Sequence, residues 1–334
     1  MDKIQTKQIR QTGQVGKMSY AGNRTKENIK WVKSKVYRKG ACSEAERYAA
    51  LAKWADRAMT GVFYGVGGFF ILLLLVLAGY IIIKGLLGFY PELLSFTNEG
   101  IGNQFFNTVY LVVLSLLISV PLGVAAGIYM AEYAKEGKFL NFLRVSIETL
   151  SSLPSIVVGL FGYLVFILMT GAKWNLMAGA LAVSILSLPL ITTTTQDAIK
   201  SLPNGYKAGS LALGATRWQT MHQVILPTIM PRIVTGIILA AGRGFGEAAA
   251  LLCTAGQSTV INWNNWNLTS PTCPLNPFRP GETLALHIWV MRTEGSLNPH
   301  AGAIASFSSA VLVMMVLLFS MTARVMSHRA EKKM

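Results

Sequence analysis

Long runs of uncharged, apolar residues place the strongest limit on how this chain can fold. A helix needs roughly 20 predominantly apolar residues to cross a bilayer. Six stretches of the sequence fit this description: Gly61–Ile83, Phe105–Ala131, Ile147–Thr170, Met177–Gln196, Ile233–Ala255 and Ala301–Ala323. Only 13% of all residues are charged, whereas about 25% is typical of a soluble domain. We therefore expect an all-α integral membrane protein with six transmembrane helices.

The basic residues are concentrated on one side of the expected membrane topology. The net charge is +15, and 25 of the 30 Lys and Arg residues lie in four segments outside the spans: the residues before Gly61, Glu132–Ser146, Asp197–Arg232 and the residues after Ala323. Positive charge is retained on the cytoplasmic side of a membrane, so we expect both termini in the cytoplasm. This topology accounts for the basicity without a nucleic-acid partner.

Three regions follow from this topology. Residues 1–57 are expected to form a basic cytoplasmic tail that anionic membrane lipid attracts, with a short helix at Ser43–Arg57 and Ser43 as its N-cap. Residues 58–325 are expected to form the multi-pass membrane domain, which includes a cytoplasmic loop at 200–227. Residues 326–334 are expected to form a short basic cytoplasmic tail.

The loop between the fourth and fifth spans has the pattern of two short helices joined by a turn. Gly214 suits the left-handed conformation that ends a helix. Thr216 and Gln219 form a capping-box pattern that starts the next helix, which Pro227 is expected to end. One narrow face of small and apolar residues is predicted from their helical spacing: Ala208, Leu211, Ala212 and Ala215.

Such a hairpin, held between two spans, is suited to dock into a groove on another protein. A DNA-binding helix-turn-helix is the structural alternative, but the segment has few basic side chains to meet phosphates. The hairpin resembles the "EAA loop" of ABC-importer permeases in its Leu211–Thr216 core and its Leu226-Pro227 end. In that family the loop forms a coupling helix seated in a cleft of the cytoplasmic ATPase.

The resemblance implies an ATPase contact for nine residues: Lys207, Ala208, Gly209, Ser210, Leu211, Gly214, Ala215, Leu226 and Pro227. The chain departs from the family pattern at Ala208, where the motif has a glutamate. The polar contact of that glutamate is therefore absent or replaced, and Lys207 is the candidate replacement.

Two further stretches resemble signatures of phosphate permeases: Glu148–Gly162 and Gly242–Leu252, which contains a Gly-Arg-x-x-Gly-Glu sequence. The stretch Thr283–Trp289 is similar to one found in PstA-type members rather than in their PstC-type partners. The resemblance implies the six-helix permease fold of type I ABC importers, in a bacterial or archaeal cell membrane. The implied function is that of a permease subunit forming half of the pore of an ATP-driven phosphate importer.

The resemblance also implies a set of partners: a second, PstC-like permease, two copies of a PstB-like cytoplasmic ATPase and an extracytoplasmic PstS-like phosphate-binding protein. The sequence has no Gly-x-x-x-x-Gly-Lys-Ser/Thr loop for nucleotide phosphates. We therefore expect a subunit that is not an enzyme by itself and binds no cofactor, with ATP and Mg used by the ATPase.

Arg243 and Glu247 are the candidate residues of the translocation path, because ionisable residues inside a span usually face the bundle interior or a water-filled path. Their i, i+4 spacing predicts a pair on one helix face. The functional interpretation is a gate or a transient phosphate contact, since arginine offers a planar fork of donors. The structural alternative is a pair that locks this helix to its neighbour.

Three hydroxyl residues are further candidates for the path: Ser151, Ser152 and Ser155. Such residues in membrane helices often bond the carbonyl of residue i−4 instead, so both interpretations stay open. Cys253 and Cys273 are both expected near the outer side, and their spacing does not decide whether they form a disulfide.

Two other functions are compatible with parts of the sequence. The first is an ABC permease for another small solute, such as sulfate, molybdate or an amino acid, which would share the coupling loop. The second is an autonomous ion-coupled secondary transporter with Arg243 and Glu247 as its intramembrane site. An autonomous carrier has no need of the docking hairpin, which therefore favours the ABC permease.

Overall fold

The computed structural model describes residues 24–96, 100–294 and 300–331, so parts of both predicted tails (1–23 and 332–334) lie outside the described residues. The chain divides into two compact units, residues 1–74 and 75–334. Helix α1 (Arg24–Leu87) has 64 residues and runs from the first unit into the second. The predicted helix at Ser43–Arg57 is part of it. The expected N-cap at Ser43 is wrong, because the helix already begins at Arg24.

Five described helical segments are long and apolar enough to cross a membrane: Leu51–Leu87, Gly102–Tyr133, Leu176–Lys200, Arg217–Gly246 and Ala301–Val325. Three of them are formed by single helices: α1, α5 (Leu176–Lys200) and α11 (Ala301–Glu331). The second consists of α2 (Gly102–Ile128) and the π-helix η3 (Tyr129–Tyr133). The fourth consists of α7 (Arg217–Gln219), the π-helix η5 (Thr220–Ile225) and α8 (Leu226–Gly246). A bent helix pair brings the number to six when the pair is counted as one span. The predicted all-α architecture is confirmed.

The third predicted span is a broken helix. It consists of α3 (Lys138–Ser152) and α4 (Ser155–Tyr163), which continues as the π-helix η4 (Leu164–Leu168), and the two parts meet at 101°. The break falls at Leu153 and Pro154, whose backbones are both extended. Pro154 explains it, because proline excludes the residue before it from the helical region and lacks a backbone donor itself.

The fifth predicted span, Ile233–Ala255, is wrong in its bounds. The continuous helix runs from Arg217 to Gly246 and ends at Glu247, whose backbone is extended (φ −74°, ψ 123°). A short helix, α9 (Ala249–Thr254), follows the break. Glycines are poor helix formers, and the helix ends in the glycine-rich sequence Gly-Arg-Gly-Phe-Gly.

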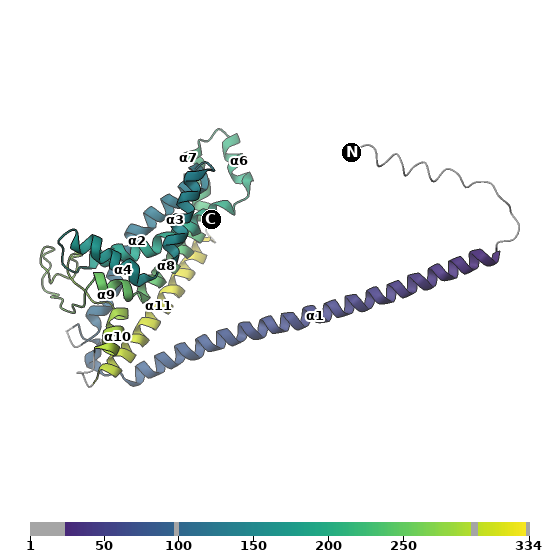
Figure 1. Cartoon of the computed structure of the whole chain (residues 1–334). Coiled ribbons are helices and arrows are strands. Elements are labelled where there is room, and N and C mark those ends of the chain that lie inside the picture. The colour runs from purple at the N-terminus through teal and green to yellow at the C-terminus, as the bar shows by residue number, and fades with distance from the viewer. Residues whose placement is uncertain (1–23, 97–99, 295–299, 332–334) are drawn as a thin grey trace. The chain divides into compact units, whose positions relative to one another are not determined.

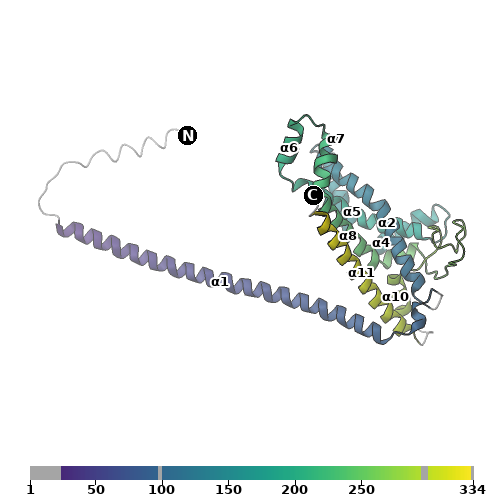
Figure 2. The same cartoon turned by 180° about the vertical axis from the view of Figure 1, so that it is seen from behind.

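Within the second unit, α5 lies at the centre of the bundle and packs against α2, α4, α8 and α9 (Figures 1 and 2). One buried cluster joins α2, α5, α9 and α10 (Leu284–Thr293) through apolar side chains: Leu111, Leu176, Val183, Leu251, Ala255 and Leu286. A second cluster joins α5 to η5 and α8: Ala198, Ile199, Met221, Ile225, Ile229 and Ile233. Such van der Waals packing is what holds membrane helices together, since lipid is as apolar as the side chains.

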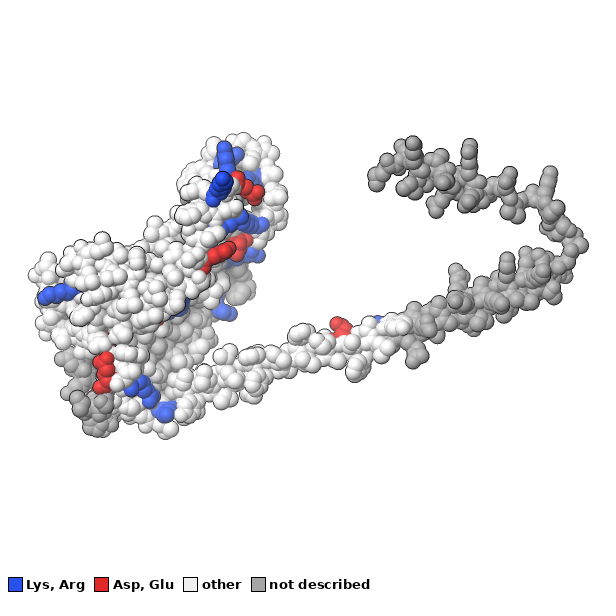
Figure 3. Space-filling view, viewed as in Figure 1, with Lys and Arg blue, Asp and Glu red and all other residues white. Residues whose placement is uncertain are grey.

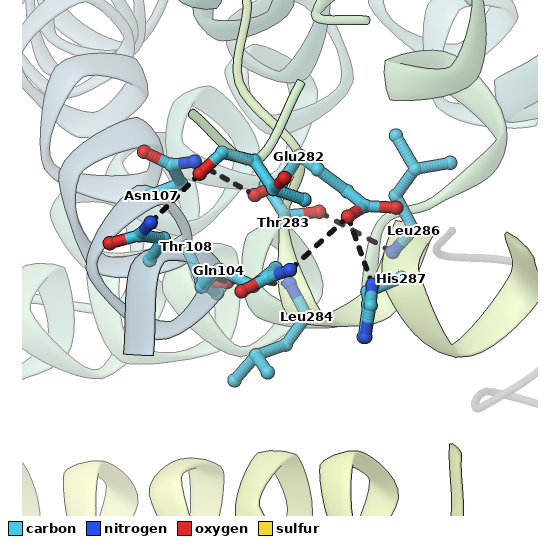
Figure 4. Close-up of polar contacts among 10 residues, drawn as sticks. Gln104, Asn107, Thr108, Glu282, Thr283, Leu284, Leu286 and His287 are labelled. Atoms are coloured by element: carbon cyan, nitrogen blue, oxygen red, sulfur yellow. Dashed lines mark hydrogen bonds and ion pairs between the residues drawn. The ribbon is translucent and has the colours of Figure 1, made fainter. Parts of the chain in front are cut away.

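A buried polar network ties the start of α10 to α2 (Figure 4). The Glu282 carboxylate lies 2.9 Å from Nδ1 of His287 and accepts a hydrogen bond from Gln104 at 3.4 Å. Thr108 accepts a hydrogen bond from the backbone N–H of Leu284 at 2.9 Å. Most buried polar groups in proteins are hydrogen-bonded, and these contacts hold the loop that precedes α10 against α2.

Arg279 extends this network within the same loop. It is fully buried, and it donates to the side chain of Asn107 and to the carbonyl oxygen of Pro274. Burial lowers the pKa of the Arg279 guanidinium to about 10, so it stays charged at neutral pH. Cys273, in the same loop, is buried and free, and Cys253 is also free, so these two cysteines form no disulfide.

Candidate functional site

The predicted hairpin is present between α5 and α8. Its first helix is α6 (Asn204–Ala212), and its second is α7, which leads through η5 into α8. Gly214 has a φ of +87°, as predicted for the turn, and the carbonyl of Ser210 accepts a hydrogen bond from the N–H of Ala215. Thr216 and Gln219 form the predicted capping box, with hydrogen bonds of 2.8 and 3.2 Å. These three local predictions are confirmed.

Two details of the predicted hairpin are wrong. Pro227 does not end the second helix. It lies in the first turn of α8, where a missing N–H is tolerated, and the helix continues to Gly246. Ala215 does not share a helical face with Ala208, because α6 ends at Ala212. The exposed small-residue face therefore consists of Ala208, Leu211 and Ala212.

Large apolar side chains of the hairpin that the sequence reasoning missed are also exposed. Leu213, next to the turn, is 91% exposed, and Trp218 on α7 is 65% exposed and stacks on His222. Tyr206 on α6 is also exposed. The available signal was the presence of these large apolar residues in a loop that was expected to lie outside the membrane. An exposed apolar patch of this kind marks an interaction surface.

Two of the predicted ATPase contacts point toward the bundle instead. Lys207 forms an ion pair with Glu132 of η3, and the hydroxyl of Ser210 lies 2.9 Å from that of Thr220 in η5. The Lys207 ammonium is thus engaged within the chain, which corrects the expectation that it replaces the motif glutamate. Leu226 is half-buried against the cluster of Ile199 and Ile225, so it belongs to the packing of the bundle.

A cavity of about 250 Å³ lies where the hairpin joins the bundle. Its walls come from η3, the end of α5, α6 and η5: Ala131, Glu132, Ile199, Lys200, Leu202, Pro203, Asn204, Tyr206, Lys207 and Ile225. Figure 3 shows Lys and Arg side chains, with a few acidic ones, gathered at this end of the bundle. The C-terminal end of α11 lies at the same end (Figures 1 and 2).

Arg243 and Glu247 do not form the predicted pair. The helix ends at Gly246, so Glu247 leaves the face that carries Arg243. Glu247 is buried, and its Oε1 accepts a hydrogen bond of 3.0 Å from the N–H of Ala250 in the first turn of α9. Arg243 is exposed and donates to the carbonyl oxygen of Leu186 at 3.3 Å. An acidic side chain suits a helix N-terminus, so Glu247 has a structural contact here.

The two signature stretches meet in the structure. Helix α4 packs against α9, and Gly159 approaches the backbone of Ala250 so closely that a Cβ there would lie 2.7 Å from its Cα. The breaks before α4 and before α9 thus belong to one packed pair of short helices. In membrane proteins, breaks of this kind are tolerated where the backbone is buried in protein or lines a cavity.

The three candidate serines lie at the first of these breaks. Ser151 and Ser152 are exposed, and Ser155, the first residue of α4, is half-buried. Ser152 donates to the carbonyl oxygen of Thr149 at 2.8 Å, so for this residue the backbone-bonded alternative is the one observed. No side chain among the described residues caps the N-terminus of α4.

The helical bundle of candidate membrane spans, with a hairpin between α5 and α8, defines a class of protein, the permeases of ABC importers. The profile of the family described as "Binding-protein-dependent transport system inner membrane component" matches residues 123–334, and the chain belongs to this family. It is therefore a multi-pass inner-membrane permease subunit. Proteins of this family are non-catalytic subunits, which agrees with the missing nucleotide-binding loop.

Relatives of this chain include permeases with and without a named substrate. The chain is 45% identical over 289 residues to "Probable ABC transporter permease protein YqgI" of Bacillus subtilis, an alignment that covers 84% of this chain and 98% of that protein. It is 34% identical over 231 residues to "Phosphate transport system permease protein PstA" of Xylella fastidiosa, covering 69% and 75% of the two chains. The predicted resemblance is confirmed.

Solved structures show the same fold at low sequence identity. A chain of a bacterial alginate ABC transporter in complex with a periplasmic protein has a TM-score of 0.59 at 17% identity, and the match covers 83% of this chain and 97% of that one. A chain of the inward-facing MetNI methionine ABC transporter has a TM-score of 0.51 at 15% identity, covering 72% and 99%. The permease fold is thereby established.

Proposed function

We propose that this chain forms half of the pore of an ATP-driven phosphate importer and that its hairpin docks on a cytoplasmic ATPase. The observation that carries the docking role is the exposed apolar tip of α6 and α7, with Leu213 as its most exposed side chain. A helix pair held at both ends by membrane helices positions such a tip rigidly. Burial of an exposed apolar surface in a partner's groove removes it from water, and this favours binding.

Phosphate is proposed as the substrate on two grounds. The chain is 34% identical to a PstA permease, and the exposed Arg243 supplies donors with the geometry of phosphate oxygens. The carboxylate of Glu247 is turned away into the cap of α9, which leaves the positive charge of Arg243 free to attract an anion. Tight binding would hinder release, so a single exposed guanidinium suits a transient contact.

The complete transporter in this proposal contains four further chains. A PstC-like permease completes the pore, two copies of a PstB-like ATPase use ATP and Mg, and a PstS-like protein delivers phosphate from outside. Both termini of this chain and the hairpin lie in the cytoplasm. The basic side chains at the hairpin end support this orientation (Figure 3). The chain itself binds no cofactor.

A permease for another small solute is the second candidate, because the relative with 45% identity has no substrate in its name. Labelled-phosphate uptake at low external phosphate separates the two. Cells without this chain should lose ATP-dependent uptake, wild type should restore it, and Arg243→Gln should not. Normal uptake without the chain, in cells with no redundant phosphate system, would exclude phosphate.

The docking role is tested separately from the substrate. Leu213→Asp should abolish copurification of the ATPase with the permease, because it places a charge in the proposed apolar contact. Leu268→Asp is the matched control, since Leu268 is a 61% exposed leucine in the loop after α9, far along the chain from the hairpin. Retention of the ATPase by Leu213→Asp would contradict the docking surface.

A further inference from the structure

The ion pair between Lys207 and Glu132 joins the docking hairpin directly to a membrane-spanning helix. Lys207 is on α6, and Glu132 is on η3, the π-helical continuation of α2. We propose that this pair fixes the orientation of α6 and passes its movements to α2, so that Lys207 and Glu132 are positioning residues for coupling. The consequence for transport rests on the proposed docking function, whereas the orientation of α6 does not.

The burial of the two partners is unequal, and it explains why the pair holds α6. The Glu132 side chain is 8% exposed, and that of Lys207 is 44% exposed. A nearly buried carboxylate is strongly destabilised when its partner is removed. Lys207 therefore cannot swing toward the ATPase without leaving a buried charge behind. The long lysine side chain keeps its outer part in water while its ammonium remains bound.

Apart from its packing along η5, few contacts restrain α6. None of its nine residues is classed as buried. Its remaining side-chain hydrogen bond to the bundle, among the described residues, joins Ser210 to Thr220. The two polar contacts attach α6 at separate points, one to the end of α2 and one to η5. Removal of the ion pair should therefore leave α6 attached at its ends and through Ser210, free to rotate about that contact.

The surroundings of the pair allow such a movement. The cavity of about 250 Å³ lies directly behind α6 and includes both Lys207 and Glu132 in its walls. The helices on either side of it continue through π-helical segments, η3 and η5. Such segments are rare and frequently occur at functional sites. This cavity leaves α6 room to shift. When α6 shifts, the ion pair passes the movement to η3, the end of α2 that carries Glu132.

The orientation of α6 is measurable without a substrate. Spin labels are placed on cysteines introduced at Gly205 of α6, where the structure leaves open space and which lies outside the proposed ATPase contact, and at Tyr133, an exposed residue of η3. The full chain, with its three native cysteines replaced by alanine, is assembled with its partner subunits in nanodiscs. Pulsed electron–electron double resonance should give one narrow distribution of the distance between the two labels. Lys207→Ala should broaden it, and the charge swap Lys207→Glu with Glu132→Lys should narrow it again.

Lys200→Ala is the matched control, because Lys200 lines the same cavity and has no ion pair among the described residues. A narrow distribution in Lys207→Ala, or a broad one in the parent chain, would overturn the proposal. The proposal would also be overturned if the distance distribution of the charge swap stayed as broad as that of Lys207→Ala. Normal assembly of Glu132→Gln would show that a change at position 132 does not by itself unfold the chain. None of these outcomes depends on whether phosphate is the substrate.

The effect on coupling is measured in the same complexes as labelled-phosphate uptake per ATP hydrolysed. Lys207→Glu should lower this ratio about tenfold, within the range of interaction energies of contacting residues, while the ATPase still copurifies. The swap should restore most of it. Loss of ATPase copurification in Lys207→Glu with no recovery in the swap would make Lys207 a docking residue and overturn the positioning role. Failure of Leu213→Asp to release the ATPase would instead contradict the docking function alone.

Discussion

Gly159 of α4 lies against the backbone of Ala250 in α9, so that a Cβ at position 159 would meet the Cα, carbonyl carbon and oxygen of Ala250 at 2.7 to 3.2 Å. Backbone atoms cannot move aside as the end of a flexible side chain can. This contact brings together the two sequence stretches that resemble phosphate-permease signatures. The glycine in the first stretch is thus explained by helix packing, whatever solute passes through the pore.

Gly159→Ala should destabilise the permease by about 1–3 kcal/mol, because overpacking forces the backbone to shift. The shift would also displace α4 and α9, and with them the breaks that carry Ser155 and Glu247. We expect a lower thermal unfolding temperature and reduced uptake. Gly302→Ala is the control, since a Cβ there meets no atom within 4 Å. Equal stability of the two variants would contradict the observed close approach.

Gly214→Ala should weaken the hairpin by about 1–2 kcal/mol, the range for a residue with a side chain in the left-handed region. The φ of +87° at Gly214 requires this conformation, whereas no atom would obstruct the added Cβ. We expect reduced ATPase copurification with normal membrane insertion, and Gly214→Asp should abolish uptake. Gly205→Ala, also open to solvent but without a positive φ, should behave as wild type. Insertion and copurification are both read from purified membranes.

Glu247→Ala should destabilise the chain by about 1 kcal/mol, because the N–H of Ala250 loses the acceptor that caps α9. Glu247→Gln keeps an acceptor oxygen at the same place and should retain most of the stability. The comparison separates the cap from a charge effect in the pore, since both variants remove the negative charge. Thermal unfolding of the purified permease reports the cap. If the two variants unfold at the same temperature, the hydrogen bond contributes little.

His287→Ala should destabilise the end of the bundle that carries α10 by about 1–3 kcal/mol, the penalty for a buried polar group without its partner. Its ring lies 2.9 Å from the Glu282 carboxylate, and both side chains are at least 90% buried. The expected result is increased proteolysis of the loop before α10, with the hairpin unaffected. His222→Ala, on an exposed residue at the other end, should leave this loop protected.

The local features of the hairpin were predictable because short-range physics determines them. A glycine at a turn, and Thr216 three residues before Gln219, act within a few residues of the chain, and the structure has both as expected. The six apolar stretches were predictable for a similar reason, since the thickness of a bilayer sets their length. Their positions in the chain survive in the structure even where the helices are broken or shifted.

The contacts between distant residues were not predictable in this way. The i, i+4 spacing of Arg243 and Glu247 suggested a pair, but the helix ends between them, where Gly244 and Gly246 lie, and Glu247 accepts a hydrogen bond in the first turn of α9 instead. Lys207 and Glu132 are 75 positions apart, and no periodicity connects them.

The sequence by itself therefore determined the membrane class, the presence of several apolar spans and the hairpin, because these depend on apolar length and on capping over a few residues. Only the tertiary structure decided which side chains of the hairpin are exposed and which face the bundle. That choice depends on how α6 is laid against η3 and η5 and on which carboxylate lies buried there. A buried charge needs a partner of opposite charge. Which residue becomes that partner depends on how the helices pack, and this involves the whole bundle.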